Sequence, residues 1–477
     1  MIRKQSNLIL IRLFMLFSLA GCAVYNTDLD RKIGAENAQQ VAQQFGLYQQ
    51  PPLAEYIEEV GQRLVAQLDS PQFTFQFHII DDPTPNAFAL PGGYIYISRG
   101  LLALMINEDE LANVLAHEII HVTERHSIKQ MRSGILPSLI ELPGSIVGIV
   151  NEKLGNLINA PISAGNDLFL SGYSRAHESE SDEKGITLAA KAGYEPLQMA
   201  NILTRLNSAV ELSTQQKQQK SYFASHPYTP DRVANINKFV KELEVKVSPS
   251  YVHQSYLSAV DELLFAENPA KGIFLGSTFV HPELGFVIDF PGKWSLLNQP
   301  QAVVAYDEKQ NSFIALSVVN NERNALQTAQ FFQQQVSKKS DTLVNYQTVS
   351  FEWGGLGYLI SFDAKRHKQS STITLLWVDF AGLTYQISSM ASTTFKSQLT
   401  QSHLSFRPIN ETEKAAITKQ NIHIVKAKQG DTLITLAERE KNQAEISYIA
   451  LINSLDKKQI LSDQQLVKIV IASPYNH

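Results

Sequence analysis

The chain has 477 residues, of which 44% are hydrophobic and 18% charged, a balance typical of globular proteins with roughly two to four domains. The formal net charge is −5, and loss of Arg3, Lys4 and Arg12 with a leader segment would bring it to −8. This charge argues against nucleic acid and against an anionic membrane surface as the main partner.

The N-terminus has the form of a secretory leader. A short basic region and an apolar stretch at residues 13–19, too short to span a bilayer, precede Leu-Ala-Gly-Cys at residues 19–22. This tetrapeptide resembles a bacterial lipobox, which implies that residues 1–21 are a lipoprotein signal peptide and that Cys22 is acylated. Ala23 then implies lipid anchoring to the outer membrane, facing the periplasm of a Gram-negative type of bacterium. Cys22 is the single cysteine of the chain, and a buried structural thiol is the alternative reading.

Helices and short strands are expected before the first strongly patterned motif. Apolar spacing between residues 25 and 70 predicts two helices, and the alternation at residues 73–80 predicts a strand. His78 on that strand is expected to be packed or solvated and not to bind a ligand. The β-branched and aromatic run at residues 94–98 predicts a second strand.

The segment before residue 94 is a candidate substrate-binding edge. An extended substrate main chain can pair with an exposed strand edge beside a catalytic metal. Asn86, Ala87, Phe88, Gly92 and Gly93 are the candidate residues, and the two glycines leave the backbone accessible where the strand begins. An ordinary hairpin next to the core fits the composition equally well.

Residues 107–126 contain the pattern that points most directly to chemistry. Apolar residues recur at helical spacing, and Asn107 with Glu110 has the form of a capping box, so a helix is expected to begin at Asn107. On that helix His117 and His121 share one face and can bind one zinc ion. In this H-E-x-x-H arrangement Glu118 is the general base that takes a proton from zinc-bound water, as in metalloproteases. Chance is the alternative, and the amphipathic helix around the motif argues against it.

Several motifs appear in the order found in a known family. They are Asn-Ala-Phe-Ala-Leu-Pro-Gly-Gly from residue 86, Arg-Gly-Leu-Leu from residue 99, Glu-Asp-Glu-Leu-Ala from residue 108 and His-Glu-x-x-His from residue 117. With them, residues 30–245 resemble the HtpX, BepA and CAAX prenyl protease family of gluzincin metallopeptidases, and within it the soluble periplasmic BepA and LoiP type. The resemblance implies a metallopeptidase domain at residues 22–247, with Zn²⁺ as cofactor and polypeptides as substrates.

A third zinc ligand is expected from a distant segment. A metzincin would have glycine at position 124 and histidine at position 127, and Glu124 and Ser127 exclude that class. His126 is one residue out of register for a metzincin ligand. It is expected to support the site from behind or to pack beside it.

The third ligand is expected in the acidic run at residues 174–185. From the residues alone, Glu178 and Glu180 are equally good candidates, and a solvated acidic face is the alternative. The family resemblance implies that Glu178 binds zinc and that Asp182, on the same helical face, supports the site. Two residues depart from the family pattern: Ile120 replaces the usual Gly or Ala, which would crowd a neighbouring helix, and Ser181 replaces the usual Ala.

A later His-Pro pair also resembles the family. His226, followed by proline and by Arg232 six residues on, resembles a loop near the metal. The resemblance implies that His226 can occupy the open zinc position as a self-inhibiting plug. It also makes Arg232 a candidate for stabilising the oxyanion that develops on the carbonyl. Without the resemblance, His226 would be a turn residue before proline.

The second half of the chain has a different pattern. Residues 275–408 read as strands with one helix near residues 325–338, which predicts an antiparallel α+β domain of open role whose three tryptophans belong to the core. Residues 421–472, with Gly-Asp-Thr-Leu at 430–433, resemble a LysM module, a βααβ unit that binds N-acetylglucosamine-containing glycan. Ser462-Asp463 replaces its usual Pro-Gly. Peptidoglycan is thus a candidate partner, although LysM-like folds also serve as spacers.

The expected architecture is therefore multidomain: a mainly α gluzincin domain with a small β-sheet, an α+β antiparallel-sheet domain and a LysM-like domain. The leading hypothesis is a periplasmic zinc endopeptidase that hydrolyses peptide bonds in envelope proteins, in outer-membrane protein quality control. The alternative is a non-proteolytic envelope assembly factor or chaperone that docks on murein. A murein hydrolase is disfavoured because the resemblance is to peptidases that act on proteins.

Overall fold

The structure is a computed structural model that describes residues 27–475, apart from 133–171, 213–221, 244–253, 308, 310–311, 320–321, 340–343, 367–368 and 392. The predicted signal peptide and the predicted lipidation site Cys22 lie outside the described residues. Among the described residues, no helix combines the length and the apolar character needed to cross a bilayer.

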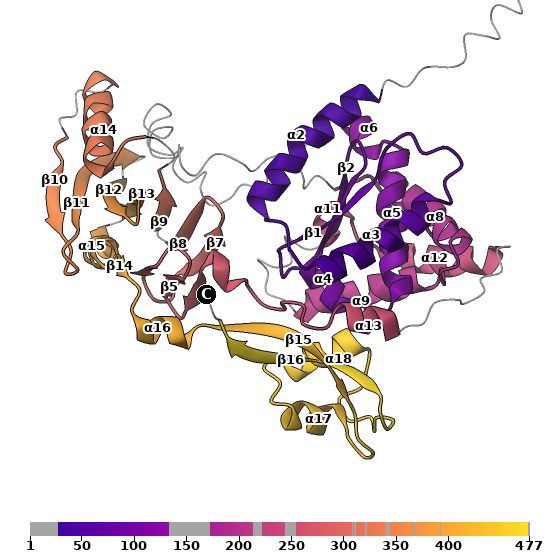
Figure 1. Ribbon diagram of the computed structural model, residues 1–477. Coiled ribbons are helices and arrows are strands. Elements are labelled where there is room, and N and C mark those ends of the chain that lie inside the picture. The colour runs from indigo at the N-terminus through magenta and orange to yellow at the C-terminus, as the bar shows by residue number, and fades with distance from the viewer. Residues whose placement is uncertain are drawn as a thin grey trace, which may run out of the picture.

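The first domain is mainly helical with a small sheet, as predicted (Figure 1). Its helices are α2 (Asp28–Gln44), α3 (Pro51–Val65), α4 (Arg99–Leu104), α5 (Glu108–Thr123), α6 (His126–Arg132), α8 (Arg175–Lys191), α9 (Gln198–Leu212), α11 (Tyr222–Ser225), α12 (Pro230–Glu242) and α13 (Gln254–Ala259). Its strands are β1 (Gln76–Ile80), β2 (Ala87–Leu90) and β3 (Tyr94–Ser98). β3 has the bounds that the sequence predicts.

The small sheet has the order β1-β3-β2, so β2 is an edge strand. β1 runs parallel to β3, and β2 runs antiparallel to it with Phe88 opposite Tyr96. The turn between β2 and β3 contains Gly92 (φ 88°) and Gly93 (φ 108°). A Cβ atom on Gly93 would lie 2.3 Å from the carbonyl oxygen of Thr74. Close packing therefore covers the backbone at Gly93, and the accessible backbone that the sequence predicts there is wrong.

Helix α5 forms the centre of the first domain. Asn107 is its N-cap, and the Asn107 side chain accepts a hydrogen bond of 2.9 Å from the backbone N–H of Glu110. The Glu110 carboxylate does not return to the N-cap as a full capping box would require. It accepts from the backbone N–H of Ile106 (2.9 Å) and binds the buried guanidinium of Arg205 at 2.7 and 2.6 Å. The start of α5 is thus tied to α9.

Helix α8 crosses α5 at very short range. A Cβ atom on Gly185 would lie 3.1 Å from both the Cα and the N of His117, so only glycine permits this approach without a shift. Ile120, which was expected to crowd a neighbouring helix, is buried in the main hydrophobic core. The close approach of the two helices is instead at Gly185, next to the backbone of His117.

The second domain has the predicted α+β character, but its strands form two antiparallel sheets and it contains helices beyond the one that the sequence predicts. One has the order β10-β11-β12-β13-β9-β8-β7, and the other has the order β14-β6-β5-β4. The strands are β4 (Ile273–Leu275), β5 (Thr278–His281), β6 (Phe286–Asp289), β7 (Ser295–Gln299), β8 (Ala302–Asp307), β9 (Ser312–Val318), β10 (Gln347–Ser350), β11 (Leu356–Arg366), β12 (Gln369–Phe380), β13 (Leu383–Ala391) and β14 (Arg407–Pro408). The helices are α14 (Ala325–Lys339), α15 (Lys396–Leu404) and α16 (Glu411–Ala416).

The large sheet is covered on both faces by different partners. Along β12, Leu375 and Trp377 belong to the hydrophobic cluster that includes α14, whereas Leu376 and Val378 belong to the cluster that includes the four-stranded sheet β14-β6-β5-β4. This alternation follows from the two-residue period of a strand. All three tryptophans lie in or against these two clusters, as expected, and Trp377 is fully buried.

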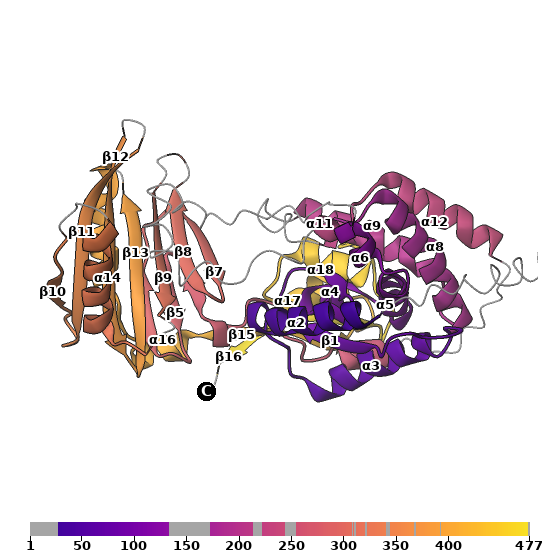
Figure 2. The same cartoon turned by 90° about the horizontal axis from the view of Figure 1, so that it is seen from above.

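The C-terminal unit has the βααβ order expected of a LysM-like module, with β15 (Thr418–Lys426), α17 (Leu433–Arg439), α18 (Ile446–Asn453) and β16 (Leu466–Pro474). β15 and β16 pair antiparallel. Figures 1 and 2 show that the sheet containing β7 to β13 lies to one side of the helical domain, whereas the βααβ unit lies against that domain. Its apolar residues, among them Leu436, Ile449 and Val467, belong to the same hydrophobic cluster as α5.

A buried lysine joins the βααβ unit to the helical domain. Lys468 on β16 is fully buried, and its ammonium group donates to the carbonyl oxygens of Ala103 (2.7 Å) and Met105 (2.6 Å), just before α5. Burial lowers the pKa of Lys468 to about 7. The predicted LysM-like region is therefore packed into the peptidase-like core, and a polar contact fixes its position.

The shifted pKa of Lys468 makes stability depend on pH in a defined direction. Between about pH 7 and the ordinary lysine pKa of 10.5, the unfolded chain binds more protons than the folded one, so this residue makes stability rise with pH. We expect the urea midpoint of the wild type to rise relative to that of Lys468→Met between about pH 7 and pH 9.5. Lys426→Met, at an exposed lysine of β15, is the control and should follow the wild type. Parallel pH profiles for wild type and Lys468→Met would contradict this.

Candidate metal centre

Four side chains from three segments converge where α5 meets α8. His117 and His121 come from α5, Glu178 comes from α8, and His226 comes from the turn after α11; all four are buried. One ligand atom from each lies within 4.8 Å of the others. The structure thus brings together the three predicted zinc ligands and the predicted plug.

The spacing of these atoms fits a tetrahedral zinc site. Ligands about 2.0–2.1 Å from a tetrahedral zinc ion are about 3.3–3.4 Å apart. The Nε2 atoms of His117 and His121 are 3.0 Å apart, and Nε2 of His121 is 3.4 Å from Oε1 of Glu178. Nδ1 of His226 lies 3.3 Å from Nε2 of His117 and 3.1 Å from Oε1 of Glu178. Three of the donors match a catalytic zinc site, and His226 lies at the fourth position.

Glu118 lies beside these donors with few partners. It is fully buried, and neither carboxylate oxygen has a hydrogen bond in the described structure; the nearest basic nitrogen is Nε2 of His226, 3.4 Å away. Burial raises the pKa of Glu118 above its usual value, while His226 and His117 oppose the rise. A carboxylate with a raised pKa and free lone pairs is suited to accept a proton near neutral pH.

Glu178 is held ionised by its surroundings. Burial alone would raise the pKa of Glu178, but His226, His121 and His117 hold it well below its usual value. Nη1 of Arg232 also lies 2.8 Å from its Oε2 atom. Glu178 is thus an anionic ligand candidate in a site otherwise built of imidazoles.

Asp182 and Arg232 support this arrangement from the far side. Oδ1 of Asp182 lies 3.1 Å from Nδ1 of His117, and Arg232 donates to both Asp182 oxygens at 2.9 and 2.8 Å. Burial would raise the pKa of Asp182, yet His117 and Arg232 lower it. Asp182 therefore lies where it can orient the candidate ligand His117, as the resemblance implies. The Arg232 donors are directed at Asp182 and Glu178.

Two aromatic residues of the site were not predicted. Tyr222 stacks on His226 at 4.3 Å between ring centroids, and its buried hydroxyl has no hydrogen-bond partner among the described residues. Tyr173 stacks on His121 at 3.9 Å. Tyr222 stands four residues before His226 and could have been placed beside it by helical spacing. Tyr173 has no comparable signal, because only the fold brings it to His121.

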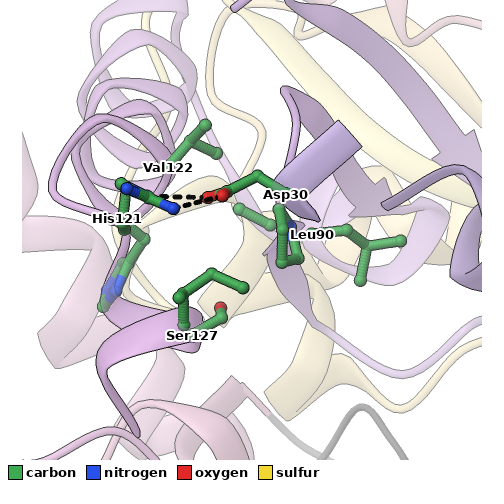
Figure 3. A pocket seen from close by; sticks show the side chains of 9 residues that line it. Asp30, Leu90, His121, Val122 and Ser127 are labelled. Carbon is green, nitrogen blue, oxygen red and sulfur yellow. Dashed lines mark hydrogen bonds and ion pairs between the residues drawn. The ribbon is translucent and has the colours of Figure 1, made fainter. Parts of the chain in front are cut away.

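A narrow hollow lies beside His121 (Figure 3). Its lining comes from β2 and the turn after it, the end of α5, the start of α6, and Asp30 of α2. Asp30 is buried and accepts a hydrogen bond of 2.9 Å from Nε of Arg125. Leu90 at the end of the edge strand and His121 are both among the residues that line the hollow. The predicted substrate-binding strand therefore lies next to the candidate metal site.

The family match agrees with this geometry. Residues 51–240 match peptidase family M48. The chain contains an M48 peptidase domain. The matched range includes every residue of the candidate metal centre, and the resemblance inferred from the motifs is confirmed.

Several relatives of this chain are named as peptidases. It is 28% identical over 246 residues to the beta-barrel assembly-enhancing protease of Yersinia pestis, covering 51% of this chain and 50% of that protein. Identity to the Escherichia coli (strain K12) protein of the same name is 28% over 208 residues, covering 43% and 42%. Identity to the mitochondrial metalloendopeptidase OMA1 of Schizosaccharomyces pombe is 27% over 223 residues, covering 46% and 63%. The chain spans about half the length of the curated relatives it matches.

Replacement of Glu178 tests the ligand set directly. We expect the wild type to bind one zinc ion per chain and to gain thermal stability from added zinc, because zinc binds the folded state. Glu178→Gln removes the anionic ligand and should lose both the bound zinc after dialysis and the stabilisation by zinc. Glu183→Gln, at an exposed glutamate of the same helix, is the matched control. A Glu178→Gln protein that keeps stoichiometric zinc would exclude Glu178 as a ligand.

Proposed function

We propose that this protein is a zinc-dependent endopeptidase that hydrolyses peptide bonds in proteins of the bacterial cell envelope. The observation that carries the proposal is the tetrahedral spacing of donor atoms from His117, His121 and Glu178, with the unpartnered carboxylate of Glu118 beside them. Membership of residues 51–240 in peptidase family M48 supports it, as do relatives that are named as peptidases.

Each residue of the centre has a proposed task. Zinc, when bound, supplies Lewis acidity that activates water and polarises the scissile carbonyl. Glu118 accepts the proton of the attacking water and then passes it to the leaving amine. The edge strand β2, whose four residues are buried in this structure, is proposed to pair with an extended substrate main chain and to place the scissile bond next to His121. Because the side chains of the centre are buried, bulk water is kept away from them.

Two side chains are candidates for stabilising the developing oxyanion. Arg232 is the candidate that the family resemblance implies, but its donors bind Asp182 and Glu178 in this structure, so a role at the oxyanion requires it to leave a carboxylate. The Tyr222 hydroxyl is buried and has no hydrogen-bond partner among the described residues, and the Tyr222 ring stacks on that of His226. We therefore assign Arg232 to positioning of Glu178 and propose Tyr222 as the oxyanion donor. Loss of casein turnover in Tyr222→Phe with retained zinc tests the assignment.

Glu118→Gln separates the endopeptidase from a binding protein. The variant keeps the shape of the side chain but cannot accept a proton, so we expect casein cleavage and self-cleavage to fall by about 10²- to 10⁴-fold. Zinc content should stay at that of the wild type, because Glu118 is not among the proposed ligands. Glu59→Gln, at an exposed glutamate of α3, serves as control. Undiminished cleavage by zinc-loaded Glu118→Gln would end the proposal.

His226 is proposed to act as an inhibitory plug. Its Nδ1 atom lies at the fourth position of the ligand set, where water must bind for catalysis. We expect His226→Ala to raise casein turnover and self-cleavage while zinc remains bound by the three other ligands. His78→Ala, at a half-buried strand histidine beside Tyr96, should leave both rates unchanged. An unchanged peptidase rate in a folded His226→Ala protein would count against the plug.

The proposed location and substrates of this protein rest on weaker similarities than the proposed reaction does. Two relatives are named beta-barrel assembly-enhancing proteases, which supports a role in quality control of outer-membrane proteins. The lipobox resemblance supports a periplasmic protein anchored to the outer membrane through acylated Cys22. Membrane fractionation of Cys22→Ala tests this placement, and release of the variant from the membrane is expected.

An envelope assembly factor that docks on murein is the second candidate. The βααβ order of β15, α17, α18 and β16 favours it, because the same segment carries the LysM-like sequence. In this case the M48 domain and its edge strand bind client polypeptides, and assembly survives in Glu118→Gln. Failure of the protein to sediment with insoluble peptidoglycan would remove the murein part.

A further inference from the structure

The two histidines of α5 are supported in different ways. A metal-binding imidazole is normally oriented by a hydrogen bond from its second ring nitrogen to a carboxylate or carbonyl. Nδ1 of His117 has a carboxylate, Asp182, at 3.1 Å. Nδ1 of His121 instead lies 3.0 Å from Nδ1 of another imidazole, His126, the first residue of α6. His126 is not among the four residues of the metal cluster.

The contact continues from His126 to a carboxylate. Nε2 of His126 lies 3.1 Å from Oε2 of Glu180 on α8. Lys184, one turn further along α8, donates to the other Glu180 oxygen at 2.6 Å. A series of side-chain contacts therefore leads from His121 to the fully buried imidazole of His126 and on to the partly exposed carboxylate of Glu180.

One proton can be assigned to each hydrogen bond in the series from His121 through His126 to Glu180 without conflict. When Nε2 of His121 faces the metal, Nδ1 of His121 carries the proton and donates it. Nδ1 of His126 must then be the acceptor, so the single proton of neutral His126 is on Nε2 and is donated to Glu180. Each ring nitrogen has one task, and the chain ends on an acceptor.

Neighbouring groups hold the His126 ring in place. His177 stacks on it at 4.3 Å with an interplanar angle of 13°. The hydroxyl of Ser181 lies 3.3 Å from Nδ1 of His126. Ser181 is one of the two departures from the family pattern, and this contact with His126 gives the departure a structural meaning.

We propose that His126 and Glu180 form a hydrogen-bonded chain that orients the imidazole of His121 for zinc. They are positioning residues and bind neither zinc nor substrate. The inference rests on the zinc site of the proposed function but does not depend on what the enzyme cleaves. It also gives a role to His126, which follows the His-Glu-x-x-His motif at a position that does not suit a zinc ligand.

The test measures zinc affinity of the full mature chain by competition with a chromophoric chelator. His126→Phe keeps a ring but removes both hydrogen bonds, and we expect its zinc dissociation constant to rise by about 10- to 100-fold. Glu180→Ala changes a partly exposed residue and should weaken zinc binding in the same direction. His126→Asn, which keeps an acceptor near the position of Nδ1, should recover part of the affinity. His177→Phe keeps the stacked ring outside the chain and is the matched control.

A double variant separates a chain from two independent packing contacts. Because Glu180 acts on His121 only through His126, His126→Phe with Glu180→Ala should bind zinc no more weakly than His126→Phe alone. The visible spectrum of the Co²⁺-substituted protein should shift in His126→Phe and not in His177→Phe. Thermal unfolding of each metal-free protein verifies that the variants are folded.

Two results would overturn the inference. One is a zinc affinity of Glu180→Ala and of folded His126→Phe that matches the wild type. The other is a double variant whose losses add as independent contributions. A wild-type chain that binds no zinc would instead overturn the proposed zinc site itself, so the two failures are distinguishable.

Discussion

The candidate site depends on the close contact between helices α5 and α8. His117 and His121 are neighbours on one helix, but Glu178 can reach them only if the two backbones approach closely. Gly185 permits this, because a Cβ atom there would lie 3.1 Å from the backbone of His117. A side chain at position 185 would require the two helices to shift by a few tenths of an ångström, so Gly185 favours the close approach of the candidate ligands although it contributes no chemical group.

Burial of α5 creates an electrostatic problem that its neighbours solve. Unpaired charges in a low-dielectric interior are costly, and the site contains three buried carboxylates. Arg232 pairs with Glu178 and Asp182, whereas Glu118 has no hydrogen bond in the described structure and has Nε2 of His226 at 3.4 Å. The carboxylates expected to bind or orient are therefore held by a guanidinium, and the one expected to move a proton lies beside imidazoles. This division of partners separates the roles of chemically identical groups.

The C-terminal unit contributes to the same core. Its apolar residues pack in the cluster that surrounds α5, and Lys468 binds the carbonyl oxygens of Ala103 and Met105 just before that helix. Arg205 of α9 holds Glu110 at the start of α5 from another side. The helix that carries both histidines is thus fixed by contacts from beyond residue 240, the end of the M48 match. Truncation at that point would remove part of the support of the site.

Much of the site follows from local pattern in the sequence. The period of apolar residues and the N-cap at Asn107 define α5, and the four-residue spacing places His117 and His121 on one face because an α-helix repeats every 3.6 residues. Local spacing could not choose between Glu178 and Glu180, because both lie on an exposed-looking acidic run. Only the crossing of α8 over α5 decided it, by turning Glu178 to Nε2 of His121 and Glu180 to His126. The same crossing gave His126 its partners, buried Arg232 against two carboxylates and placed Tyr173 on His121, because contacts between distant segments depend on packing that no local period encodes.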